Sequence, residues 1–194
     1  MRTISIPIHI DRLRSLADRF DHLRSELANT APLTGTEGLR QLTQHLRTSH
    51  ELTIEALTRL TAIDGSQATQ MTGALSALDC LAQTVQHSGH VSDSLTRAIS
   101  DNAYEGTSWD PAKDTDVIGR GLRHMDARKA IAAHFSDAAA SLAICAEGCR
   151  VVANHLIDAF PVPDRTHAHA AANTMTASRI PAAVDLAAPA RTRR

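Results

Sequence analysis

Residues 131–160 read IAAHFSDAAASLAICAEGCRVVANHLIDAF, and this stretch decides the fold class. A helix has about 3.6 residues per turn, so side chains spaced three or four apart share one face. Pro161 and Pro163 end the segment, because proline lacks a backbone N–H and clashes with the preceding turn. We therefore expect one long helix that begins near residues 118–122. Its apolar face carries Ile131, Phe135, Ala138, Leu142, Cys145, Cys149, Val152, Leu156 and Phe160.

Three earlier segments show the same periodicity. The first follows Asp11 as a cap, the second follows Thr36, and the third opens near Ser66 after the Asp64-Gly65 turn. We predict an all-α protein, built as an antiparallel four-helix bundle. The apolar stripes are Leu13, Leu16, Phe20, Leu23 and Leu27 in the first segment, Leu39, Leu42, Leu46, Leu57 and Leu60 in the second, and Met71, Leu75, Leu78, Ala82 and Val85 in the third.

The composition is consistent with an aliphatic helical core. Only five of the 194 residues are aromatic, which favours helices packed closely on small side chains over a β-sandwich. The net charge of −1 argues against a dedicated DNA-coating protein. No apolar run approaches the ~20 residues of a membrane span, and no secretory signal is visible. We expect a cytoplasmic protein with no membrane partner.

Both ends of the chain differ from the bundle. Ile4, Ile6, Ile8 and Ile10 alternate with other residues, so residues 1–10 are predicted to form an extended arm that packs on the bundle or on a second copy. Residues 161–194 are rich in Ala, Pro and Arg and are predicted to be a disordered tail. Five arginines against two aspartates make this tail basic, so nucleic acid is a partner only through it. The predicted domains are 1–10, 11–160 and 161–194.

Histidine–aspartate pairs three residues apart suggest metal half-sites on helices. They are His90/Asp93, His134/Asp137 and His155/Asp158. An antiparallel hairpin of the last two helices would place His90 level with His134. With His50 and Asp137 these residues form a candidate site for a transition metal such as Zn or Fe; the alternative is ordinary surface pairs and no cofactor. The Glu-x-x-His pattern of di-iron bundles is absent from the sequence.

His50 interrupts the apolar stripe of the second helix, with Ser49 and Thr53 beside it. This polar cluster is either a hydrogen-bonded core network or the wall of a polar pocket, in which His50 acts as acid or base near Glu55. The three cysteines include Cys145 and Cys149, four apart on one helical face. We expect these two in the core rather than on a metal, and Cys80 pointing away from them.

The only tyrosine and the only tryptophan lie in one connection between helices. Tyr104 and Trp109 combine an apolar body with a hydrogen-bonding tip, a combination enriched at binding hot spots. We therefore predict a non-enzymatic helical interaction protein, acting by protein–protein contacts or self-association. Its predicted binding residues are Tyr104, Trp109, Ile4, Ile6 and Ile8. The alternative is a small-molecule- or metal-binding bundle, or an enzyme, with a histidine-lined site between the second, third and fourth helices.

Overall fold

The computed structural model describes residues 5–104 and 117–160. These residues form four α-helices and one short 3₁₀-helix, with no strand among them: α1 (Ile6–Asn29), α2 (Gly35–Asp64), η1 (Gln67–Gln70), α3 (Ala74–Ser100) and α4 (Val117–Ala159). The predicted all-α helical bundle is confirmed. The predicted tail of residues 161–194 lies outside the described residues, as do Ile4 and Trp109.

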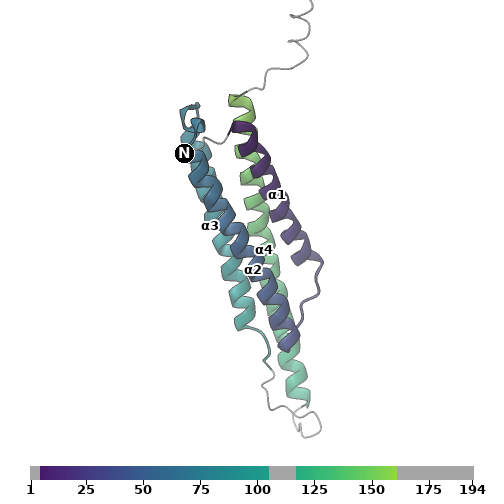
Figure 1. Cartoon of the computed structure of the whole chain (residues 1–194). Helices are drawn as coiled ribbons and strands as arrows, with labels where there is room; N and C mark the ends of the chain where they lie inside the picture. The colour runs from purple at the N-terminus through teal and green to yellow at the C-terminus, as the bar shows by residue number, and fades with distance from the viewer. Residues whose placement is uncertain (1–4, 105–116, 161–194) are drawn as a thin grey trace, which may run out of the picture. The chain divides into compact units, whose positions relative to one another are not determined.

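Consecutive helices run in opposite directions (Figure 1). For α3 and α4, three hydrogen bonds show the same, because the residue number falls along α4 as it rises from Thr72 through α3. His155 meets Thr72, Cys145 meets Thr84, and His134 meets Asp101. None of the helices in residues 5–104 and 117–160 combines the length and apolar character that a membrane span requires.

The long helix α4 is the hub of the bundle. It packs extensively on both α1 and α3, whereas α2 packs on α3 and makes fewer contacts with α1. At 43 residues it is also much longer than α1, which has 24. Its N-terminal end extends past the ends of the other helices (Figure 1).

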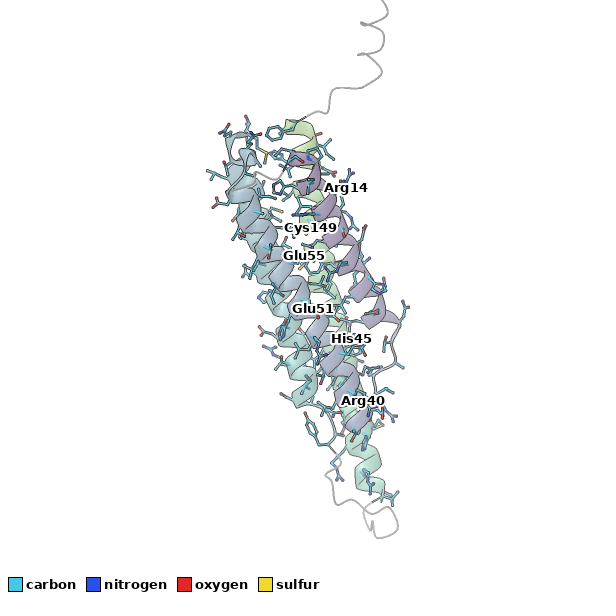
Figure 2. All side chains as sticks on the ribbon, in the orientation of Figure 1. Arg14, Arg40, His45, Glu51, Glu55 and Cys149 are labelled. Atoms are coloured by element: carbon cyan, nitrogen blue, oxygen red, sulfur yellow. The ribbon has the colours of Figure 1, made fainter. Side chains whose placement is uncertain are left out.

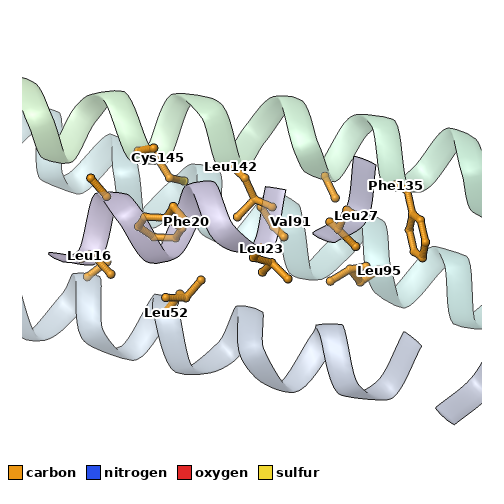
Figure 3. Packing of buried hydrophobic residues seen from close by; sticks show 14 of the residues in the cluster. Leu16, Phe20, Leu23, Leu27, Leu52, Val91, Leu95, Phe135, Leu142 and Cys145 are labelled. Carbon is orange, nitrogen blue, oxygen red and sulfur yellow. The ribbon is translucent and has the colours of Figure 1, made fainter. Parts of the chain in front are cut away.

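The core is aliphatic, as the composition indicates. Figure 3 shows Phe20 and Leu23 of α1 packed among Leu52 of α2, Val91 of α3 and Leu142 of α4. The predicted stripe of α1 is wholly buried, and so is that of α4 from Ile131 to Leu156. A smaller cluster lies nearer to η1 and contains Ile10, Leu13, Ile63, Ala68, Ala77, Leu81, Val152, Ala153 and Leu156.

The predicted extended arm is wrong from residue 6 onward, since α1 begins at Ile6 with Ser5 as its N-cap. Pro7 lies in the first turn, where a backbone N–H has no helical partner to lose. Ile6, Ile10 and Leu13 continue the apolar stripe of α1 at helical spacing, and burial of Ile10 outweighs the period-two pattern. The caps also differ from prediction: Asp11 lies inside α1, and Thr34 rather than Thr36 precedes α2.

The core faces of α2 and α3 match the predicted stripes only in part. Leu42 is buried, and Leu46, Leu60, Leu78 and Val85 are half-buried against the core. Leu57 and Leu75 are exposed, the latter to 83%. The buried faces combine large aliphatic side chains with small or polar ones. These are Leu42, His45, Ser49, Leu52, Ala56 and Ile63 in α2, and Ala74, Ala77, Leu81, Thr84, Ser88, Val91, Leu95 and Ala98 in α3.

The end of α3 is hydrogen-bonded to the start of α2. The buried Asn102 side chain accepts from the Gly35 N–H and donates to the Gly35 carbonyl, both at 2.9 Å. Gly38 follows within the first turns of α2, where a Cβ would lie 2.4 Å from the Leu33 carbonyl oxygen and 3.1 Å from Asn102 Oδ1. This junction therefore depends on glycine at position 38.

We expect Gly38→Ala to destabilise the protein and Gly89→Ala to stabilise it slightly. Alanine is favoured over glycine inside helices by up to about 1 kcal/mol, and Gly89 has open space for a methyl group. At Gly38 the obstacle is backbone, so overpacking should cost about 1–3 kcal/mol. Urea unfolding of both variants measures the difference. Equal effects of the two substitutions would contradict the close approach at Gly38.

Candidate functional site

The structure does not bring the predicted metal ligands together. His50, His90 and Asp137 are exposed, and His134 is half-buried. The prediction that His90 faces His134 is wrong, because His134 Nε2 lies 2.8 Å from Asp101 Oδ2 instead. Asp101 follows His90 by eleven residues, which corresponds to about 16 Å along α3 at about 1.5 Å per residue.

His90 has a different neighbour, the ring of His87, with centroids 5.4 Å apart in an edge-on arrangement. Across the described ranges, no group of three or more His, Cys, Asp or Glu side chains is arranged to hold a metal ion. The predicted pairing of His90 with His134 assumes that α3 ends and α4 begins at the same height in the bundle. Because α4 extends beyond α3, that assumption shifts the pairing along the helix.

The core histidine of α2 is His45 rather than His50. Positions 45, 49, 52 and 56 follow helical spacing, so Ser49 belongs to the buried face while His50 points outward. The His45 ring meets Phe135 edge-on, with centroids 5.8 Å apart (Figure 2 marks His45). Ser49 is hydrogen-bonded to Ser92 at 3.0 Å. This hydrogen bond belongs to the buried side of α2, whereas His50 is exposed and takes no part in it.

Burial lowers the pKa of His45, and the negative charge of Glu26 opposes this shift in part. Desolvation disfavours the charged imidazolium, so the ring is neutral in the folded protein at neutral pH. His45 thus packs in the core as a neutral ring, and its protonation lowers the free energy of unfolding.

We expect the protein to lose stability as the pH falls below about 6.5, and His45 to account for part of the loss. The unfolded chain binds a proton at His45 near the ordinary value of 6.5, whereas the folded chain resists it until a lower pH. Between these two values protonation favours unfolding. Urea unfolding at neutral and mildly acidic pH should show a smaller loss for His45→Gln than for the wild type. His50→Gln, at an exposed position, should retain the wild-type loss, and identical losses in all three proteins would refute the assignment.

The cysteines are structural. Cys145 and Cys149 are fully buried, and burial raises the pKa of each thiol to about 12. Cys145 donates to the Thr84 carbonyl at 3.4 Å. Cys80 is half-buried and its sulfur faces the Gly148 carbonyl on α4 at 3.6 Å, contrary to the expectation that it points away. Protonated thiols are poor nucleophiles and metal ligands.

The predicted binding residues that the structure describes lie on helices or at their ends. Ile6 is half-buried against the smaller core cluster, and Ile8 is exposed on α1. Tyr104 follows α3 and is exposed, with its hydroxyl donating to the Ile99 carbonyl at 2.5 Å.

A surface that sequence reasoning missed lies at the N-terminal end of α4. We call it the α4 stripe, and its members are Val117, Ile118, Leu122 and Met125, which are 67%, 81%, 52% and 57% exposed. His124, which lies between Leu122 and Met125, is hydrogen-bonded at 2.7 Å to Thr34, the N-cap of α2. Val117, Ile118 and Leu122 therefore precede that junction along α4, and Met125 lies beside it. The sequence shows the helical spacing of residues 118, 122 and 125, but it does not show that α4 extends past the other helices.

A pocket of about 710 Å³ lies at the other end of the bundle, between η1 and the end of α4. His155 and Asp158, one of the pairs noted in the sequence, lie in its wall, and His155 Nε2 is 3.0 Å from the Thr72 carbonyl oxygen. A smaller pocket of about 300 Å³ shares these two residues. The larger pocket is lined by Gln67, Gln70, Met71, Thr72, His155, Asp158, Ala159 and Phe160.

The chain matches no protein-family model, no curated protein and no solved structure. Its function is therefore inferred from its own geometry. That geometry offers two surfaces at opposite ends of the bundle, one apolar and projecting, the other concave and partly polar.

Proposed function

We propose that this protein is a non-enzymatic helical interaction protein that associates with a second copy of itself through the α4 stripe. The observation that carries the proposal is the exposure of four large apolar side chains within nine residues of one helix. Contiguous exposed apolar patches on soluble proteins often mark interaction sites. The dispersal of the histidines and the protonated state of the buried thiols favour this function over catalysis.

A second copy fits the shape of this surface. A two-fold contact needs only one patch that complements itself. Because this end of α4 extends past α1, α2 and α3, two such ends can lie side by side without collision of the bundles. Gly121 lies one helical turn from both Ile118 and Met125, and a Cβ there would meet open space, so a second helix can approach closely.

The stripe supplies the apolar centre of such a contact, with four large side chains on one end of one helix. The contact is small compared with the roughly 800 Å² per partner of a standard interface, so we expect a dissociation constant in the micromolar range.

The test is the oligomeric state of the full chain in sedimentation equilibrium. We expect concentration-dependent dimers for the wild type and at least about a tenfold weaker association for Leu122→Glu, because the interface would bury an unpaired carboxylate. Leu75→Glu is the matched control, since Leu75 is even more exposed but lies on α3. It should dimerise like the wild type.

Circular dichroism establishes that both variants fold. A wild type that is monomeric at the highest soluble concentrations would overturn self-association. A dimer that Leu122→Glu leaves intact would overturn the assignment to the α4 stripe.

A further inference from the structure

The pocket between η1 and α4 has a wall that is fixed in place. Gly73 adopts a left-handed backbone conformation with φ of 83°, and a Cβ there would lie 2.7 Å from His155 Nε2. The imidazole is thus packed on the Gly73 backbone and hydrogen-bonded to Thr72. A side chain fixed by packing and a hydrogen bond requires little ordering when a ligand binds.

The polar groups of this pocket favour hydrogen-bond donors. The Thr72 carbonyl can only accept, so His155 Nε2 donates to it. Gln67 and Gln70 line the pocket with side-chain amides, which can accept as well as donate. Asp158 supplies a carboxylate, and among the residues that line the pocket no arginine or lysine opposes it. A positively charged donor is therefore favoured over an anion.

The remaining lining is apolar. Met71 and Phe160 are half-buried, and both pack against the smaller core cluster beneath the pocket. A thioether and an aromatic ring offer contact area to a hydrocarbon body, and the ring face also attracts cations. The volume of about 710 Å³ falls within the range of small-molecule sites.

We infer that this pocket binds a primary ammonium compound with a short apolar body. The ammonium group donates to the Asp158 carboxylate and to the glutamine oxygens, while the body lies against Met71 and Phe160. This inference is independent of the self-association proposed above, because the α4 stripe lies at the opposite end of the bundle (Figure 1).

The test uses two probes of similar shape and opposite charge, 2-phenylethylammonium and phenylacetate, titrated into the full chain by calorimetry. We expect the ammonium compound to bind at least about tenfold more tightly than the carboxylate, a difference of about 1.4 kcal/mol. Asp158→Asn should weaken binding of the ammonium compound about tenfold or more. Asp137→Asn is the matched control, an exposed aspartate of the same helix outside the pocket.

Phe160→Ala should weaken both probes, because it removes the surface for their shared ring. Leu122→Glu should bind the ammonium compound like the wild type, which separates this inference from the proposed dimer. Equal affinity for the two probes, no detectable binding of either, or unchanged ammonium binding in Asp158→Asn would each overturn the proposal.

Discussion

The close contact between α3 and α4 is the constraint on which the bundle depends. A Cβ on Gly148 would lie 2.4 Å from Thr84 Oγ1 and 3.6 Å from the sulfur of Cys80, so the two helices meet where side chains are smallest. The thiols of Cys80 and Cys145 add hydrogen bonds to carbonyls across the contact. Because α4 also packs on α1, its position relative to α3 sets the position of both neighbours. Asp21 and Arg150 pair across the α1–α4 contact and fix its register.

The parts of the fold that could be predicted are those in which large apolar residues form the buried face. The stripes of α1 and α4 contain leucine, isoleucine and phenylalanine at helical spacing, and both are buried. In α3 the buried face combines Leu81, Val91 and Leu95 with alanine, serine and threonine, while Leu75 is exposed. Small side chains bury little area each, so their contribution comes from the close approach they permit, and a pattern of large apolar residues cannot reveal that.

The candidate sites were harder to predict because they depend on where helices end relative to one another. His90 and His134 were matched by assuming level ends, but α4 overshoots α3 and brings His134 to Asp101. The pocket at His155 needs the short η1 turn and Gly73 to close one side, and neither shows a strong pattern in the sequence. His45 was missed because its neighbour His50 is the more conspicuous interruption of the leucines. Local spacing therefore identified helical faces, whereas relative helix position decided the sites.

The projecting end of α4 has an energetic consequence beyond its apolar surface. The N-terminal end of α4 extends past the ends of α1, α2 and α3, so the core of the bundle contributes little to its order (Figure 1). Helical segments shorter than about 12 residues are marginal in water by themselves. A molecule that docks on this end would shift the local helix–coil equilibrium as it binds. The free energy of assembly therefore includes the free energy of ordering the N-terminal end of α4.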